Sequence, residues 1–252
     1  MLKKARVIGF EGLSEEPYAS IICYPHTTKA KLKGRLEELQ KLGVEALEFI
    51  GGKEVTNIPV LGKGCVGIVV IAYRKGEKVA LKIRRVDADR AHMQHEADML
   101  RKANSVNVGP NFLDVSRNFL LMQFIDGVLF PHWLERHMGK ARIATVLREI
   151  LEQCWRLDNV GLDHGELSHA PKHIVMKKDE PFIVDFETAS SNRKPSNVTS
   201  ICQFLFVSGQ VAEKVAEKIG RKDKNTIIAA LKNYKRDRTR KNFETVLEAC
   251  VF

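Results

Sequence analysis

A loop with three glycines contains the first residues whose types and spacing suit ligand chemistry. It reads VLGKGCVGIVV and fits the pattern G-x-G-x-x-G-x-V, with glycines at Gly62, Gly64 and Gly67. β-Branched residues on both sides predict one strand before the loop and a second strand after it. A dinucleotide-binding loop would lead into a helix instead. The pattern therefore leaves two interpretations, a loop that covers the phosphates of a nucleotide and a plain glycine hairpin.

A lysine and a glutamate follow at positions where they would support a phosphate-binding loop. Lys82 ends the segment VALK, one predicted strand further on, and Glu96 lies 14 residues later (96 − 82 = 14) in a predicted helix. A lysine in such a strand can hold nucleotide phosphates, and a carboxylate on the next helix can hold the lysine in place. Taken singly, each would be read as a solvated surface residue. Their order after the loop favours nucleotide binding.

Two further segments continue this order. LLMQFIDG predicts a strand and a connector, and the backbone of Gln123 and Ile125 in it would hydrogen-bond adenine; an ordinary buried strand and turn is the alternative. Asp185 ends the apolar strand FIVDF. An acid at the end of a strand beside bound phosphates is the expected position for a Mg²⁺ ligand, although a turn or capping aspartate has the same sequence context.

From about Ile58 to Phe186, roughly half the chain, these motifs resemble the protein-kinase-like superfamily. They are most similar to its small atypical branch, which contains the RIO kinases, the kinase subunit of the KEOPS tRNA-modification complex and predicted archaeal Ser/Thr kinases. The resemblance implies an α+β, two-lobed protein-kinase-like fold with a truncated helical C-lobe, which binds ATP and Mg²⁺. The resemblance implies that the three glycines form the phosphate loop, that Lys82 and Glu96 form an ion pair, and that Asp185 binds the metal.

The catalytic loop departs from the family pattern H-x-D-x-x-x-x-N. In HGEL, Glu166 stands where the catalytic aspartate is expected. The asparagine is missing, and the nearest candidate is His173, seven residues after Glu166 (173 − 166 = 7) rather than five, as a two-residue insertion would explain. The resemblance thus assigns Glu166, Lys82 and Asp185 as catalytic residues, with Asp185 and His173 as metal ligands. Since imidazole suits Mg²⁺ poorly, His164, His169 and His173 could instead form a transition-metal site, but simple loop histidines are the favoured interpretation.

The strands and helices expected around these motifs divide the chain into three parts. Residues 1–52 would form a small α+β appendage, residues 53–125 a kinase-like N-lobe and residues 126–252 a helical kinase-like C-lobe. In the appendage, strands are expected at ASIICYP and ALEFIGG, on either side of a helix. A second helix is expected at about 88–103, and apolar stripes predict helices at 143–154 and 243–250.

The basic charge of the chain is concentrated near its end. The formal net charge is +10, and residues 221–241 contain nine Lys or Arg and two Asp, a net +7 (9 − 2 = 7). Ile227, Ile228, Leu231 and Tyr234 would face inward on a helix there. The charges would then form either an RNA or ribosome contact or a solvated face, of which the solvated face is favoured.

Five cysteines without a C-x-x-C pair and the lack of a long apolar run predict a cytoplasmic protein with no membrane span. The favoured function is ATP- and Mg²⁺-dependent phosphoryl transfer by a Ser/Thr protein kinase or ATPase. Glu187, in place of the glycine expected after Asp-Phe, and the absence of an A-P-E segment suggest a choline-kinase-like enzyme acting on a small-molecule hydroxyl. The altered catalytic loop suggests a third possibility, a pseudokinase that binds nucleotide and RNA without turnover.

Overall fold

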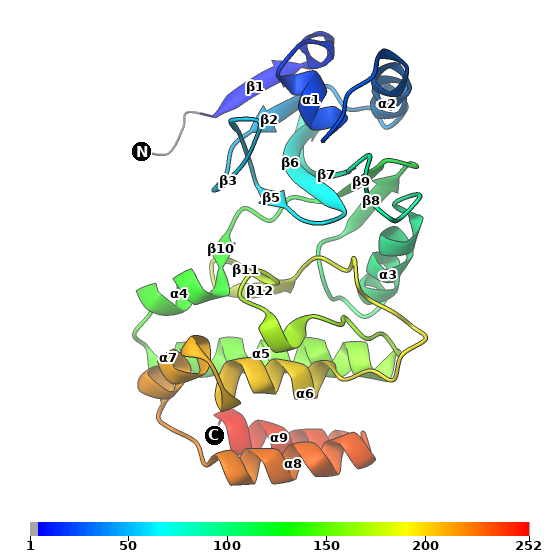
Figure 1. The fold of residues 1–252 in the computed structure, drawn as a ribbon. Helices are drawn as coiled ribbons and strands as arrows, with labels where there is room; N and C mark the ends of the chain where they lie inside the picture. The colour runs from blue at the N-terminus through cyan, green and yellow to red at the C-terminus, as the bar shows by residue number, and fades with distance from the viewer. Residues whose placement is uncertain (1–4, 252) are drawn as a thin grey trace. The chain divides into compact units, whose positions relative to one another are not determined.

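The computed structural model describes residues 5–251 (Figure 1) and divides the chain into two compact units. Among the described residues, the first unit contains residues 5–98 together with Asn111–Phe124, and the second contains Met99–Pro110 and residues 125–251. The first is built on an antiparallel sheet and the second is mainly helical, so the expected α+β class is confirmed. No helix within residues 5–251 combines the length and the apolar character needed to cross a membrane.

The first unit contains a seven-stranded antiparallel sheet. Six strands follow one another in the order β1-β2-β6-β7-β9-β8, and the short β5 pairs with β6. A separate hairpin is formed by β3 (Lys53–Val55) and β4 (Ile58–Val60). The strands of the sheet are β1 (Arg6–Gly9), β2 (Ala46–Phe49), β5 (Gly62–Lys63), β6 (Gly67–Arg74), β7 (Glu77–Arg84), β8 (Phe112–Val115) and β9 (Phe119–Gln123).

Residues from the expected appendage 1–52 belong to this same sheet. The strand β2 pairs with β6 as well as with β1. Helices α1 (Tyr18–Ile22) and α2 (Lys29–Lys41) contribute Ile21, Ile22 and Leu39 to a core that also contains Leu81 and Phe119 of the central strands. The described part of this segment therefore shares a core with the strands that follow it.

One strand prediction here is wrong, and one predicted helix begins later than expected. ASIICYP forms the helix α1 rather than a strand, because one turn of helix buries Ala19, Ile21 and Ile22, and so short an apolar run has no distinguishing period. The helix expected at 88–103 is α3 (Gln94–Asn104) and begins six residues later (94 − 88 = 6). The N–H of Met93 donates to the carbonyl of Arg117, and the guanidinium of Arg84 donates to the carbonyl of Arg90, which holds the residues before α3 in an irregular loop.

The second unit combines a small sheet with six α-helices among the described residues. Its antiparallel strands are β10 (Val128–Leu129), β11 (Ile174–Lys177) and β12 (Glu180–Ile183). The apolar stripe predicted at 143–154 is buried in α5, which confirms that helix and its inward face; its residues are Ile143, Val146, Leu147, Ile150, Leu151 and Cys154. The helices are α4 (Phe130–Arg136), α5 (Lys140–Asn159), α6 (Asn197–Cys202), α7 (Gln210–Ile219), α8 (Lys224–Arg236) and α9 (Arg240–Val251).

A buried carboxylate joins three of these helices. Asp158 at the end of α5 accepts hydrogen bonds from the Tyr234 hydroxyl of α8 (2.9 Å) and from the amide groups of Asn197 at the start of α6 (2.9 and 2.8 Å). Burial raises the pKa of Asp158, and these donors oppose that shift. Ile228 was predicted to face inward and is 38% exposed. The buried face of α8 is centred on Ile227, Ala230 and Tyr234, and consecutive helical positions differ by about 100°.

Candidate functional site

The glycine loop is a hairpin between β5 and β6. Gly62 pairs with Val69, and the N–H of Gly64 donates to the carbonyl of Gly67 at 2.8 Å. A Cβ added at Gly67 would lie 3.0 Å from both Cγ and Cε of Lys82, and 3.1 Å from the carbonyl oxygen of Ile83. At Gly64 the nearest such atom is 3.7 Å away. The third glycine is therefore the one that lets the aliphatic stem of Lys82 pass close beneath the hairpin.

An arginine next to β7 holds this hairpin in place. The N–H of Arg85 donates to the carbonyl of Val66 at 2.8 Å, and its Nη1 donates to the carbonyl of Gly64 at 3.1 Å. Its other guanidinium nitrogens bind Asp87, and the guanidinium lies 5.2 Å from the ring centre of Tyr24. Sequence reasoning missed Arg85, since an arginine at the end of a strand is usually solvated and no motif distinguishes it.

Lys82 and Glu96 form a buried ion pair. The Nζ of Lys82 lies 2.9 Å from Oε1 of Glu96, and each side chain is 5% exposed. Lys82 lies near the end of the central strand β7, and Glu96 lies in the first turn of α3. The structure thus brings together two residues that the sequence placed 14 positions apart (96 − 82 = 14). A buried charge is tolerated when it is paired in this way, so the ammonium has a fixed position.

The predicted adenine contacts lie where the chain passes from the first unit into the second. Gln123 ends β9 in the first unit, and Ile125 is the first residue of the second unit after it. The backbone N–H of Gln123 donates to the carbonyl of Asn111 at 2.8 Å, and its side-chain Oε1 accepts the N–H of Asn111 at 3.1 Å. Since that N–H is already engaged within the protein, an adenine contact here must use other backbone groups of the connector.

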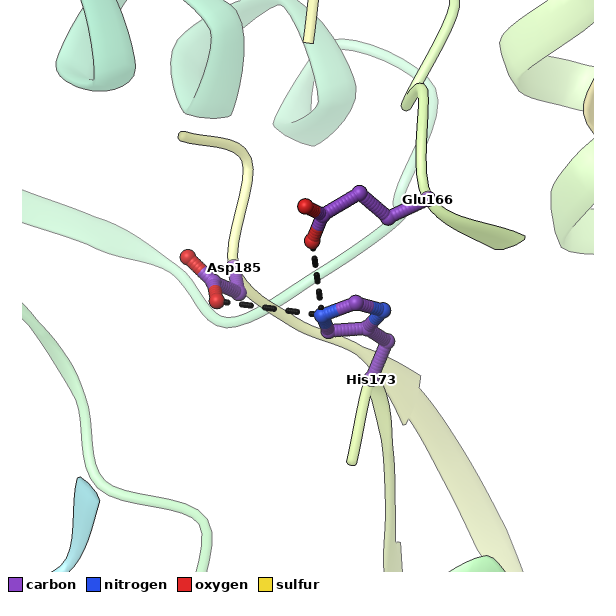
Figure 2. A group of neighbouring side chains, drawn as sticks. All are labelled: Glu166, His173 and Asp185. Carbon is purple, nitrogen blue, oxygen red and sulfur yellow. Dashed lines mark ion pairs between the residues drawn. The ribbon is translucent and has the colours of Figure 1, made fainter. Parts of the chain in front are cut away.

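Figure 2 shows the carboxylates of Glu166 and Asp185 both facing the same ring nitrogen of His173, in the second unit. The Nε2 of His173 lies 3.0 Å from Oε2 of Glu166 and 3.8 Å from Oδ2 of Asp185. The histidine side chain is 2% exposed, whereas Glu166 and Asp185 are 38% and 33% exposed. One ligand atom from each of the three residues lies within 4.8 Å of the other two. Two carboxylates and one imidazole therefore meet at a partly open position.

The small sheet explains why His173 and Asp185 lie near each other. His173 immediately precedes β11 and Asp185 follows β12, and these strands pair with Ile174 opposite Ile183. The N–H of Val184 continues the pairing by donating to the carbonyl of His173 at 3.0 Å. Asp185 then turns away with φ of 69°, a left-handed conformation that aspartate tolerates better than most residues. Sparsely populated backbone conformations of this kind often mark functional positions.

The loop before Glu166 is held by buried polar residues that sequence reasoning missed. The Oδ1 of Asn197 accepts the N–H of His164 at 2.8 Å, and its Nδ2 donates to the carbonyl of Leu162. Asp163 accepts hydrogen bonds from Arg193 Nε at 2.9 Å and from the N–H of Ser196 at 3.0 Å. These contacts join residues about thirty positions apart, and no local pattern in the sequence indicates them.

The three histidines have different surroundings. Burial lowers the pKa of His164 to about 4, and its Nε2 donates to the carbonyl of Val184 at 3.1 Å, so it is a structural residue. His169 is exposed beside Ser168. Burial also lowers the pKa of His173, although the carboxylates of Asp185 and Glu166 act in the opposite direction. His173 is therefore the histidine of this set that offers a neutral imidazole next to carboxylates.

The side chains of the site differ in how well they suit ATP and Mg²⁺, the two cofactors implied by the sequence. A fixed ammonium at Lys82 next to a glycine hairpin suits phosphate oxygens. The carboxylates of Glu166 and Asp185 are oxygen ligands of the type that Mg²⁺ prefers. The imidazole of His173 is a better ligand for transition metals than for Mg²⁺.

Comparison with known proteins identifies two relationships. The family model of the RIO domain matches residues 70–201, which is more than half of the chain. The matched segment includes Lys82, Glu96, Glu166, His173 and Asp185, and it begins after the glycine hairpin. An uncharacterized protein of Methanocaldococcus jannaschii is 28% identical over 98 residues, which cover 39% of this chain and 83% of that protein.

Proposed function

Because the chain belongs to the RIO domain family, a family of atypical kinases and ATPases, we propose that it transfers the γ-phosphoryl group of ATP to a hydroxyl group. The observation that carries this proposal is the buried Lys82–Glu96 pair beneath Gly67. A plain hairpin has no need of a lysine that is held by a glutamate and packed against the third glycine. A phosphate-binding site needs such a lysine, because its ammonium must be in place before the nucleotide arrives.

In this proposal the first unit binds the nucleotide. The Nζ of Lys82 contacts phosphate oxygens, while Glu96 fixes its direction through the 2.9 Å contact. The hairpin at Gly62, Gly64 and Gly67 offers backbone close to the phosphates, and Arg85 keeps its carbonyls at Gly64 and Val66 in place. The N–H of Gln123 takes no part, so adenine is bound by other groups of the connector that contains Ile125.

The second unit supplies the groups that act on the acceptor. Glu166 is partly exposed, so its carboxylate can accept the proton of an incoming hydroxyl, and His173 at 3.0 Å limits its rotation. Asp185 holds the divalent cation, assigned by the family resemblance as Mg²⁺. When bound, this ion neutralises phosphate charge and orients the γ-phosphoryl group. Glutamate is one methylene longer than the aspartate of the family pattern, so its placement depends on these neighbours.

The acceptor is proposed to be a Ser or Thr hydroxyl of a protein. The main alternative is a small-molecule hydroxyl, which is supported by the short connection at 187–196 between the Asp185 loop and α6. This connection is largely occupied with internal contacts, because Arg193 and Ser196 bind Asp163 and Ser190 pairs with it. It leaves little chain for docking a peptide.

A labelled-phosphate assay distinguishes these possibilities. The full-length protein is incubated with γ-labelled ATP and Mg²⁺, with either a protein extract or a metabolite extract as the acceptor. Label in protein supports the first proposal, label in a metabolite supports the alternative, and free phosphate alone supports an ATPase. ATP binding without release of label in any pool would show a nucleotide-binding protein without turnover. Glu180→Gln is a suitable control variant, because Glu180 is an exposed carboxylate at the start of β12.

A further inference from the structure

We propose that Tyr24 is a positioning residue that holds the glycine hairpin in place for ATP. The inference rests on the proposed function, since it concerns how the phosphate-binding hairpin is held before the nucleotide arrives. Tyr24 lies in the connection between α1 and α2, and its contact Lys63 lies in β5. Both precede residue 70, where the match to the RIO domain begins, so that match assigns a role to neither residue.

Tyr24 is attached to the core of the first unit. Its side chain is partly buried against the cluster that contains Ile21 and Leu81. Its carbonyl accepts the N–H of Val86, the residue after Arg85, at 2.8 Å. Because both packing and this hydrogen bond hold Tyr24, its ring has a fixed position beside the end of β7.

Two cations lie against the ring of Tyr24. The Nζ of Lys63 is 4.9 Å from the ring centre, and the Cζ of Arg85 is 5.2 Å from it. Lys63 pairs with Ile68 on the other strand of the hairpin. A cation within about 6 Å of an aromatic ring centre is attracted to the face of the ring. Tyr24 therefore contacts the hairpin directly through Lys63 and indirectly through Arg85.

Arg85 connects the ring to the tip of the hairpin. Its N–H donates to the carbonyl of Val66 at 2.8 Å, and its Nη1 donates to the carbonyl of Gly64 at 3.1 Å. Asp87 binds the other guanidinium nitrogens, but its side chain is 41% exposed and water screens that pair. Tyr24 and Asp87 thus orient the guanidinium together, and the guanidinium in turn orients two carbonyls of the tip.

A hairpin with three glycines needs such contacts, because glycine restricts the backbone little. A mobile hairpin would lose conformational entropy when it closes on phosphates, and this cost would weaken ATP binding. Contacts that hold the hairpin beforehand remove part of the cost. Since Tyr24 is not among the groups assigned to the chemical step, its loss should act on ATP affinity rather than on the rate at saturating ATP.

The first measurement is hydrogen exchange of the full-length protein without nucleotide, followed by NMR. The amides of Gly64 and Arg85 each donate to a hairpin carbonyl at 2.8 Å, so their exchange reports opening of the hairpin. In Tyr24→Leu we expect both amides to exchange about 3–10-fold faster than in the parent. Tyr24→Phe keeps the ring and should keep the parent rates. Unchanged exchange in Tyr24→Leu overturns the inference.

Tyr18→Leu is the matched control. Tyr18 is also partly buried against the same cluster, and its ring stacks on Phe49 with the ring centres 5.1 Å apart. The change removes comparable aromatic packing from the first unit and leaves the contacts of Tyr24 in place. The two amides should then exchange within about 2-fold of the parent rates. Equal acceleration in Tyr18→Leu and Tyr24→Leu would make Tyr24 an ordinary packing residue and refute its positioning role.

Calorimetry and initial rates connect the hairpin to ATP. Tyr24→Leu should raise both Kd and KM for ATP by about 3–10-fold and leave kcat within about 2-fold of the parent. Tyr24→Phe should have the parent values. A fall in kcat with unchanged KM in Tyr24→Leu would contradict a role in holding the hairpin for ATP.

A double-mutant cycle tests whether Lys63 acts through the ring or binds phosphate itself. If it acts through the ring, Lys63→Met should weaken ATP binding by about 2–5-fold in the parent and have little further effect in Tyr24→Leu. Equal effects of Lys63→Met in the two proteins would contradict the direct contact between Tyr24 and the hairpin.

The outcomes separate this inference from the proposed function. Faster exchange in Tyr24→Leu, in a protein whose parent form binds no ATP, would support Tyr24 as the residue that holds the hairpin and refute nucleotide binding. ATP binding and turnover that are the same in Tyr24→Leu and the parent would refute the role of Tyr24 and leave the proposed function intact.

Discussion

Two clusters of charged side chains differ in how completely the protein satisfies them. In the first unit, Lys82 and Glu96 are both 5% exposed and neutralise each other at 2.9 Å. In the second unit, two carboxylates that are 38% and 33% exposed share one buried imidazole, whose Nε2 lies 3.0 Å from Glu166 and 3.8 Å from Asp185. The first cluster is arranged before any ligand arrives, whereas the second has donor atoms in a position that suits a cation.

This difference fits the proposed division of roles, in which the first unit binds the nucleotide and the second unit supplies the groups for the reaction. A partly exposed carboxylate can reach an acceptor or a metal, and its environment changes with each ligand. The two clusters should therefore respond differently to mutation, with effects on stability in the first and on activity in the second.

The largest expected effect is on stability, at Lys82. Lys82→Met leaves Glu96 buried without its ion-pair partner, and we expect a loss of about 3–5 kcal/mol in the free energy of unfolding. The double variant Lys82→Met/Glu96→Gln should recover most of this loss. Urea unfolding of the parent, the single variant and the double variant measures it. A double variant that is no more stable than Lys82→Met would show that the pair is not the cause.

Lys78 on the same strand is the matched control for Lys82. Its ammonium lies 2.8 Å from Glu48, but its side chain is 45% exposed. Its partner Glu48 is 7% exposed but keeps a hydrogen bond from the Tyr73 hydroxyl at 2.8 Å, and the ammonium of Lys78 is largely hydrated, so Lys78→Met should cost much less than Lys82→Met. Equal losses at the two lysines would remove the contrast between a buried lysine and a half-exposed one.

The next effect is on activity, at Asp185. Asp185→Asn should lower phosphoryl transfer or ATP hydrolysis by more than about 100-fold, because even residues behind a metal ligand contribute about 10–100-fold. Initial rates with labelled ATP measure the loss, and Glu180→Gln should retain the parent rate. Activity of Asp185→Asn within a few fold of the parent would exclude Asp185 as the ligand of an essential cation.

A smaller effect is expected at the glycine hairpin. Gly67→Ala places a Cβ 3.0 Å from the stem of Lys82 and should cost about 1–3 kcal/mol through overpacking. Gly64→Ala is the control, since the Cβ added at Gly64 would lie 3.7 Å from its nearest neighbour, the carbonyl oxygen of Gly67. Thermal unfolding compares the two variants. Gly64→Ala should be nearly as stable as the parent, and the reverse order would contradict the packing of Gly67 on Lys82.

The sequence predicted the parts of the site that rest on local spacing. The glycine pattern and the strand with Lys82 could be placed because the spacing of their residues is short and distinctive. The clusters around Arg85 and Asn197 could not be predicted, because their partners lie about 20–40 residues away and are polar residues of ordinary type. The strand predicted at 19–25 was wrong because a short apolar run fits a strand and a helical turn equally well.

The basic segment at 221–241 gives the smallest expected effect, and RNA binding there stays a prediction. Arg240 binds both carboxylate oxygens of Glu152, at 2.7 and 2.8 Å, so it is a poor candidate for phosphate contact. Lys235 and Arg236 at the end of α8 are exposed. If they contact single-stranded RNA, changing both to Gln should reduce the slope of log affinity against log salt by about 1.4, at about 0.7 per contact.

Arg240→Gln is the control for the basic segment and should leave the salt slope unchanged. Filter binding of an RNA oligonucleotide at several salt concentrations measures the slopes. Identical slopes for the parent and the Lys235→Gln/Arg236→Gln variant would mark the segment as a solvated surface.

The most direct test of the division between binding and chemistry is Glu166→Gln, with ATP affinity and turnover measured on the same protein. Calorimetry with ATP and Mg²⁺ should give an affinity within about 2-fold of the parent, because Lys82 and the hairpin are unchanged. Turnover of labelled ATP should fall by about 10²–10⁴-fold, which is the usual contribution of a positioned proton acceptor. Unchanged turnover in Glu166→Gln would contradict the role of this carboxylate, and loss of ATP binding would contradict the division itself.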